Sequence, residues 1–354
     1  MSVRSVAREH YRDRSRLIRG IERLAGALWR RVDRSSIADS WASLVPALLP
    51  QVAAAQRTAA STADAYLRVA LSEQGLSPAA EGRVNVDALV GVASDGRELQ
   101  VLLEWPALTA LTALSRGHTV DRAMAAGEAH VRMIAATQVA DAGRVADQVA
   151  MTARPAATGY RRMLVGMSCS RCVILAGRWY AVNAGFRRHP LCDCIHVPGR
   201  EDTTDDVRTN PTAYFESLSA EEQDRVFTKA GAEAIRLGAN INQVVNARRG
   251  ARGLTTAGAR VTGAEARMLR GGRSRGRLEA VDMYGRQLLV TSEGVTVRGV
   301  AGIRLGARET GQRRAGDRYR SARTPRLMPE SILQIAGDDR GEAIRLLKRF
   351  GYII

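Results

Sequence analysis

Residues 120–152 read VDRAMAAGEAHVRMIAATQVADAGRVADQVAMT, and this alanine-rich run predicts the longest helix of the chain. Alanine has the highest helix propensity of all residues. Thr119 is placed to cap the first turn, and Arg154-Pro155 ends the run, because the residue before a proline is pushed out of the α region. We therefore interpret residues 120–152 as the spine on which the rest of the chain packs.

The residues before this spine show the same helical style. Between residues 4 and 32, apolar side chains recur at intervals of three and four with charges between them, which is typical of an amphipathic helix. The pattern continues over residues 39–71, where Pro46 and Pro50 are expected to interrupt or kink the helix. We predict an N-terminal helical hairpin or bundle over residues 1–98.

The remainder divides by composition into four further parts. We predict a central helical domain over 99–200 that ends in a cysteine and histidine cluster, and a small helical unit over 201–250 with a capped start near Ser219. Residues 251–325 read as a basic arm with a short β-hairpin at about 280–305, and 326–354 as a C-terminal helical segment. The predicted fold class is mainly α.

Composition supports this class and limits the environment. Of the 354 residues, 45% are hydrophobic but only 5% are aromatic, which suits helices better than an aromatic-rich sandwich or barrel. No run approaches eighteen apolar residues, and the N-terminus lacks the apolar core of a secretory signal. We expect no membrane anchor, synthesis in the cytoplasm and reduced cysteines.

Positive charge is concentrated in one segment. The chain carries a net charge of +17, and only Lys229 and Lys348 are lysines. Residues 248–326 hold 19 arginines against six acidic residues, a net charge of +13 that leaves +4 for the other 275 residues. Such a segment is typical of an arm that faces a polyanion or an acidic partner. The candidate contact residues are Arg248, Arg249, Arg252, Arg270, Arg273, Arg275, Arg277, Arg313, Arg314, Arg318 and Arg320.

All four cysteines lie in one stretch of the chain together with two of the five histidines. Cys-x-x-Cys at 169–172 is followed by Cys-x-Cys at 192–194, and thiolate and imidazole are the ligands that zinc prefers. If residues 191–197 are extended, alternate side chains project to the same side. The six candidate metal ligands are Cys169, Cys172, His189, Cys192, Cys194 and His196.

Which four of these six donors would bind a structural zinc ion stays open. The preferred set is Cys169, Cys172 and His189 with either Cys192 or Cys194, and an all-cysteine site is the close alternative. Two other interpretations are four buried free thiols, or a thiolate nucleophile at Cys192 or Cys194 beside His189. The sequence contains no phosphate-binding Gly-Lys-Ser/Thr, no His-Glu-x-x-His and no Gly-x-Ser-x-Gly motif.

The cysteine stretch resembles a known family. His189-Pro-Leu-Cys192-Asp-Cys194, preceded by Cys169-Ser-Arg-Cys172, is similar to the cysteine and histidine segment of Mu F-like minor head proteins of tailed bacteriophages. Residues 222–250 and 326–352 resemble the actinobacteriophage branch of these proteins, and the excess of arginine over lysine suits a GC-rich host. The resemblance covers roughly residues 100–354.

The resemblance implies a protein that acts in head morphogenesis near the portal. Because the sequence shows no Ser/His/Asp-type pattern, we expect a structural, non-enzymatic role. The expected partners of such a protein are portal and capsid or scaffold proteins, and its expected location is the host cytoplasm during assembly and then the virion head. Contact with packaged double-stranded DNA, or injection together with it, is a further expectation for the basic arm. The alternatives are a capsid maturation peptidase, a thiol-dependent enzyme, a basic linker that docks on acidic capsid surface, and a host DNA-binding regulator.

Overall fold

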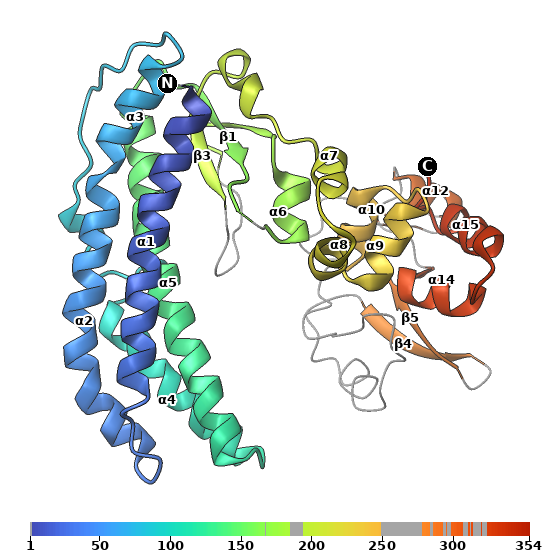
Figure 1. Cartoon of the computed structure of the whole chain (residues 1–354), viewed down its shortest axis with the longest axis horizontal. Coiled ribbons are helices and arrows are strands. Elements are labelled where there is room, and N and C mark those ends of the chain that lie inside the picture. Colours follow the sequence, from blue (N-terminus) through green and yellow to red (C-terminus); the bar gives the residue numbers. More distant parts are fainter. Residues whose placement is uncertain are drawn as a thin grey trace. The chain divides into compact units, whose positions relative to one another are not determined.

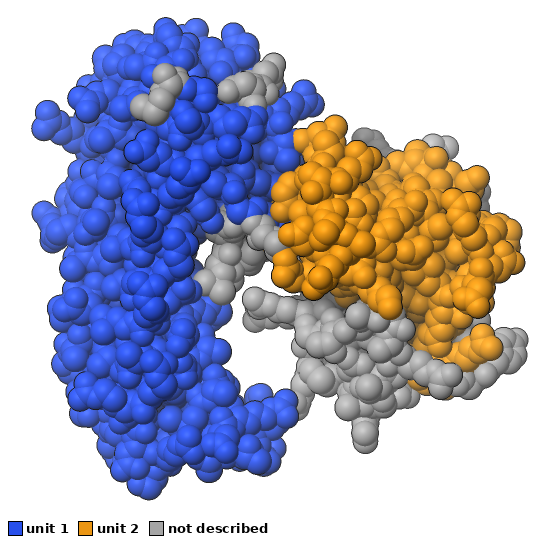
Figure 2. All heavy atoms as spheres, viewed as in Figure 1, with its two compact units in different colours: residues 1–168, 175–209 blue, residues 169–174, 210–354 orange. Residues whose placement is uncertain are grey.

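The computed structural model describes residues 2–166, 168–184, 194–248, 278–283, 286–292, 295, 299–306, 311, 313, 320 and 324–354 (Figure 1). The fold is mainly helical, as the sequence predicts, with two small antiparallel sheets. It divides into two compact units, coloured separately in Figure 2. Unit 1 consists of Met1–Ser168 and Leu175–Thr209, and unit 2 of Cys169–Ile174 and Asn210–Ile354.

Unit 1 is built around the predicted spine, helix α5 (Val120–Thr152). Helices α1 (Val3–Trp29), α2 (Ile37–Ser61) and α4 (Leu99–Ser115) all pack against α5, and the long helices lie side by side in Figure 1. They enclose one core of buried apolar side chains. Residues 1–98 and 99–168 therefore form one body, and the predicted boundary at residue 98 falls inside it.

The ends of α5 follow from its sequence. The Thr119 hydroxyl accepts a hydrogen bond from the backbone N–H of Arg122 at 3.3 Å, which confirms the predicted N-cap. The helix ends at Thr152, two residues before Arg154-Pro155. At 33 residues, α5 is about 50 Å long.

Of the two outcomes predicted for Pro46 and Pro50, an interruption or a kink, the interruption does not occur in α2. The helix runs from Ile37 to Ser61 through both Pro46 and Pro50. Val45, Leu48 and Val52 on the same helix are buried in the bundle core. Burial of this apolar face compensates for the backbone hydrogen bonds that the two prolines cannot donate. The chain ends α2 at Ser61 and continues as α3 (Ala63–Ser72).

Two tryptophans fix the centre of this core. Trp29 and Trp41 are fully buried and meet edge to face, with ring centroids 5.0 Å apart. The indole N–H of Trp29 donates to the Met124 carbonyl at 2.9 Å, and that of Trp41 donates to the Leu103 carbonyl at 2.8 Å. Each ring thus buries a large apolar surface and still satisfies its polar atom.

A second core joins the helices to a small sheet in the same unit. Strands β1 (Gly159–Met163), β2 (Trp179–Ala181) and β3 (Ile195–Gly199) pair antiparallel in the order β2-β1-β3. The connections include two short 3-10 helices, η1 (Asp87–Leu89) and η2 (Asp202–Val207). Buried side chains from α1, α3, α5 and the sheet form the core, among them Val6, Leu67, Met151, Tyr160 and Val197.

Unit 2 begins with short helices. They are α6 (Ser170–Leu175), whose last residue is assigned to unit 1, α7 (Pro211–Glu216), α8 (Ala220–Phe227), α9 (Lys229–Arg236) and α10 (Ile241–Ala247). Helices α7 to α10 each have a side-chain N-cap. The predicted start near Ser219 is a complete capping box with Glu222. Gly238 follows α9 with φ +98°, a conformation that favours glycine at a helix end.

The predicted hairpin is present, but its neighbourhood differs from the prediction. Strands β4 (Leu278–Met283) and β5 (Arg286–Thr291) pair antiparallel, and β5 also pairs with β6 (Arg326–Leu327). Residues 300–304, expected to be part of a strand, form helix α12 (Val300–Arg304). Ala301 and Leu305 are four residues apart and pack together with Val295, which is helical spacing.

The C-terminal helices α14 (Pro329–Ala336) and α15 (Arg340–Arg349) complete unit 2. Arg326 is fully buried, lies over the Tyr352 ring with 4.5 Å to its centroid, and donates to the side-chain and backbone oxygens of Gln243 in α10. The Tyr352 hydroxyl in turn donates to the Leu327 carbonyl at 2.9 Å. Residues 210–248 and 326–354 are therefore one packed body rather than separate segments.

No helix in the described ranges is both long enough and apolar enough to cross a membrane.

Candidate functional site

The described part of the cysteine and histidine stretch leads into strand β3 of unit 1. Cys194 is buried and immediately precedes the strand, and His196 lies within it. Residues 195–199 are extended, as the alternation argument requires, and all five are buried. Residues 185–193, which include His189 and Cys192, lie outside the described residues.

Among the described strands, β3 is at the edge of its sheet, and the side chains of Tyr66 within α3 and of Gln74, two residues after α3, satisfy two of its carbonyl groups. The Tyr66 hydroxyl donates to the His196 carbonyl at 2.7 Å, and the Gln74 amide donates to the Pro198 carbonyl at 2.8 Å. The Gly199 carbonyl instead accepts from Thr158, on the β1 side. Buried carbonyl groups at a free edge would otherwise lack partners. These hydrogen bonds fix the position of the β3 backbone and therefore the position of His196 in the sheet.

The His196 imidazole is part of an aromatic stack. It lies against the Tyr160 ring with centroids 4.1 Å apart and an angle of 27° between planes. Tyr160 stacks in turn on Tyr180, with centroids 5.3 Å apart, and its hydroxyl donates to the Ala184 carbonyl at 2.8 Å. The ring of His196 is thus held by packing.

A buried arginine anchors the loops around this sheet. The Arg161 guanidinium donates to the Gly177 carbonyl, the Glu201 carbonyl and the Thr204 hydroxyl, at 2.9, 2.7 and 3.1 Å. These acceptors lie between β1 and β2 and directly after β3. Because guanidinium presents several donors in a rigid plane, the single side chain of Arg161 can fix the positions of both loops.

The other cysteine pair belongs to unit 2. Cys169 is exposed and directly precedes α6, whereas Cys172 is buried and lies in the first turn of that helix. The Cys169 carbonyl accepts the N–H of Val173 at 3.1 Å, so the two thiols are one helical turn apart, one of the two arrangements considered for Cys-x-x-Cys. Arg171 between them donates to the Asn246 side chain of α10 at 3.0 Å.

The six predicted ligands are therefore only partly described. Cys169 and Cys172 are in unit 2, Cys194 and His196 are in unit 1, and His189 and Cys192 lie outside the described residues. Among the described residues, no three His, Cys, Asp or Glu side chains are grouped closely enough to hold a metal ion. The zinc site stays a prediction.

The predicted polyanion contacts also divide into two groups. Arg248 lies largely inside unit 2, where it forms an ion pair with the buried carboxylate of Glu330, and burial lowers the pKa of its guanidinium to about 10. Its charge is therefore used within the fold. Arg313 and Arg320 are exposed. The others lie outside the described residues, and they are Arg249, Arg252, Arg270, Arg273, Arg275, Arg277, Arg314 and Arg318.

No local sequence pattern predicts which residues support strand β3 from distant parts of the chain. Tyr66 lies in the predicted helical run 39–71 and Gln74 lies just beyond it, and both contact β3 about 130 residues later in the chain. A residue's role as a partner of a distant edge strand has no local pattern.

Tyr66 provides a test of how the edge of β3 is held. Replacing Tyr66 with phenylalanine keeps the aromatic ring but removes the donor to the His196 carbonyl, and we expect a loss of about 1–3 kcal/mol in the free energy of unfolding. Urea denaturation measures the change. Arg68→Ala, at an exposed position of the same helix, is the control and should change stability by less than about 0.5 kcal/mol. Equal stability of wild type and Tyr66→Phe would contradict the edge role.

Comparisons of the chain with protein-family models, with curated proteins and with solved structures find no match.

Proposed function

We propose that the chain is a structural minor head protein of a tailed bacteriophage that acts in capsid assembly near the portal. The observation that carries the proposal is the resemblance at Cys169-Ser-Arg-Cys172 and His189-Pro-Leu-Cys192-Asp-Cys194. Two features of the fold agree with it. Unit 1 contains a bundle of long helices that offers surface for protein contacts, and the two further stretches that carry the resemblance, 222–250 and 326–352, belong to unit 2.

The basic segment 248–326 suggests a second partner for the protein, the packaged DNA. Residues 248–326 hold 13 of the 17 net positive charges, and Arg313 and Arg320 are exposed. We assign this segment to contact with packaged double-stranded DNA through phosphate neutralisation, without reading of base sequence. Because the buried Arg248 is paired with Glu330, it is left out of the contact set.

Assembly in the phage that encodes the chain tests the proposed function. Mass spectrometry of purified virions should find the chain in few copies, and an amber mutant in its gene should yield defective heads. The chain, expressed in full, should bind duplex DNA with an affinity that falls steeply between 50 and 200 mM salt, by roughly 10³-fold or more if six or more phosphates are contacted. Normal, infectious heads from the amber mutant would refute the proposal.

We propose further that the cysteine and histidine stretch binds a structural zinc ion. Thiolates and imidazole suit zinc, and a metal site would stabilise a segment whose residues 185–193 lie between two strands of one sheet. The residues that would hold it are Cys169, Cys172 and His189 with Cys192 or Cys194. The ion would act by fixing the local fold, not by chemistry on a substrate.

Metal analysis checks this proposal. The full chain, purified under reducing conditions, is expected to contain about one zinc ion, as a closed structural site does. Cys172→Ser should remove the metal and lower the melting temperature. His118→Ala, which changes an exposed histidine outside the stretch, should keep both. A folded wild-type chain without zinc would contradict the site.

A further inference from the structure

Helix α4 exposes apolar side chains on the side that does not enter the core. Leu99, Leu103 and Ala110 are buried in the bundle, whereas Trp105 and Leu108 are 42% and 61% exposed. Val101 and Leu111 are exposed as well, so the exposed residues recur at intervals of four and three along the helix. A helix that is apolar all round is normally buried all round, and a continuous exposed apolar stripe marks a contact surface.

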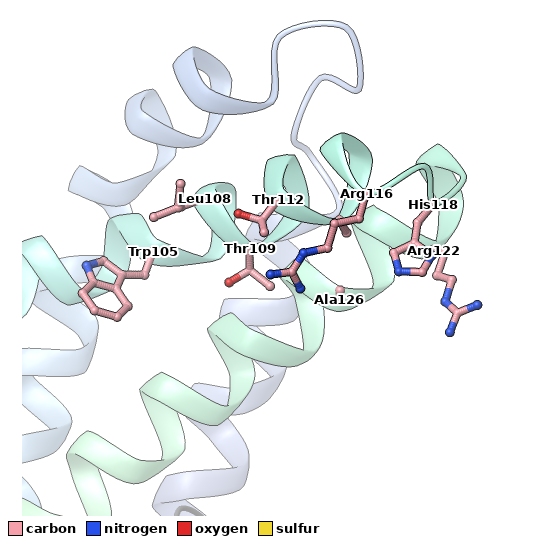
Figure 3. A pocket seen from close by; sticks show the side chains of 9 residues that line it. Trp105, Leu108, Thr109, Thr112, Arg116, His118, Arg122 and Ala126 are labelled. Atoms are coloured by element: carbon pink, nitrogen blue, oxygen red, sulfur yellow. The ribbon is translucent and has the colours of Figure 1, made fainter. Parts of the chain in front are cut away.

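The stripe leads into a pocket where α4 meets the start of α5. The pocket has a volume of about 460 Å³. Trp105, Leu108 and Thr112 of α4 line its apolar part, and Arg116, His118 and Arg122 lie together near the turn between the two helices (Figure 3). We call the stripe and the pocket together the α4 groove.

The basic side chains at this end of the groove make no ion pair or hydrogen bond within the described part of the chain. Arg116, His118 and Arg122 are exposed, and none of their side chains makes an ion pair or hydrogen bond there. Other arginines of the same bundle are paired, for example Arg30 with Glu128 at 2.9 Å and Arg34 with Asp121 at 2.7 Å. An apolar surface that ends in unpaired cations is complementary to an apolar surface that ends in carboxylates.

We propose that the α4 groove binds an acidic amphipathic helix of a partner protein. From Val101 to Thr112 the stripe is about 17 Å long, which matches roughly three turns of a helix laid along it. The partner's apolar face would cover Trp105 and Leu108, and its carboxylates would pair with Arg116 and Arg122. A second copy of this chain fits less well, because it carries a net charge of +17 and would add cations to this surface.

A selection experiment identifies the preferred partner chemistry without a known ligand. The probe is a displayed library of 16-residue helices with leucine at one face and glutamate or lysine in equal proportion at the flanking positions, selected on the full chain. We expect glutamate to be enriched in the selected helices. Their affinity should fall at least 10-fold with Arg116→Glu/Arg122→Glu and with Leu108→Asp, and it should weaken with added salt.

Matched variants separate this surface from general charge effects. Arg12→Glu/Arg19→Glu changes two exposed α1 arginines that make no ion pair within the described residues, and it should leave the affinity unchanged. The proposal is overturned if lysine is enriched, if the selected helices bind the Arg116→Glu/Arg122→Glu variant equally well, or if no helix is selected. A dimer that Leu108→Asp dissociates would overturn it too, since the occupant would then be a second copy. The test does not depend on a role in head assembly.

Discussion

Replacing Asp147 with alanine is expected to lower the free energy of unfolding of unit 1 by about 3–5 kcal/mol, the cost of breaking a buried ion pair from one side. Asp147 is buried in α5, and both its oxygens are engaged by α1. The Arg14 guanidinium donates to them at 2.8 and 3.0 Å, and His10 Nε2 lies 3.2 Å from Oδ1. Alanine would leave the cation of Arg14 buried without its counter-charge.

The residues around this ion pair are buried, so water is poorly placed to solvate the Arg14 charge that the substitution would leave unpaired. The His10 ring stacks on Tyr66 with centroids 4.0 Å apart, and burial raises the pKa of Tyr66 well above its ordinary value. Tryptophan fluorescence during urea denaturation measures the effect, because all four tryptophans, at positions 29, 41, 105 and 179, lie in unit 1. Asp13→Ala, which removes an exposed pair with Arg16 on α1, should cost less than about 1 kcal/mol.

The same pair predicts a dependence of stability on pH. Burial alone would raise the pKa of Asp147, but the charge of Arg14 and the hydrogen bond with His10 outweigh it and hold that pKa well below the ordinary range. Because the pKa is lowered in the folded state, the contribution is fully present above the ordinary aspartate pKa of about 3.9 and is lost as the pH falls below it. The difference between wild type and Asp147→Ala should therefore be constant from pH 5 to 7 and narrow below about pH 4. A difference that stays constant down to pH 2 would contradict this assignment.

A double variant separates the charge from the packing. Arg14→Leu/Asp147→Leu removes both charges and should be more stable than Asp147→Ala, because no unpaired charge stays in the core. If the double variant is the less stable of the two, the pair acts through shape rather than charge.

Local sequence patterns were enough to predict the helices of unit 1 but not the contacts between those helices. Spacing and capping residues predict α1 and α5 nearly to their ends, since each signal lies within one turn of the residue it concerns. Pro46 and Pro50 do not end α2, because burial against other helices outweighs their local penalty. The pairing of His10 with Asp147 joins positions 137 residues apart and leaves no local trace.

In the candidate site, too, local features could be predicted from the sequence and tertiary contacts could not. The predicted ligand set requires an extended segment over 191–197, and the described part of that segment is extended from residue 195 onward. The sequence did not predict that the His196 imidazole would stack on Tyr160, or that Arg248 would turn inward to Glu330, since both depend on which elements meet. The exposed stripe of α4 was equally hidden, because apolar residues surround that helix and only the packing decides which of them stay uncovered.

Gly127 is the position where the close packing of α1 and α5 allows no side chain. A Cβ atom built on Gly127 would lie 2.0 Å from Cζ2 of Trp29, whose ring is fully buried and whose indole N–H is bonded to the Met124 carbonyl. The helices can approach this closely only because α5 presents hydrogen in place of a methyl group at this point. Gly127→Ala must displace either the Trp29 ring or the whole of α1.

We expect Gly127→Ala to destabilise unit 1 by about 3 kcal/mol, at the upper end of the cost of overpacking a core. This cost exceeds the gain of roughly 0.5–1 kcal/mol that alanine brings over glycine within a helix. Gly20→Ala on α1 is the matched control, because a Cβ there meets nothing within 4 Å, and it should raise stability by that smaller gain. Urea denaturation followed by tryptophan fluorescence compares the two. If both variants shift stability in the same direction, then α1 and α5 are not packed around Trp29 in this way, because only that contact makes the two glycines differ.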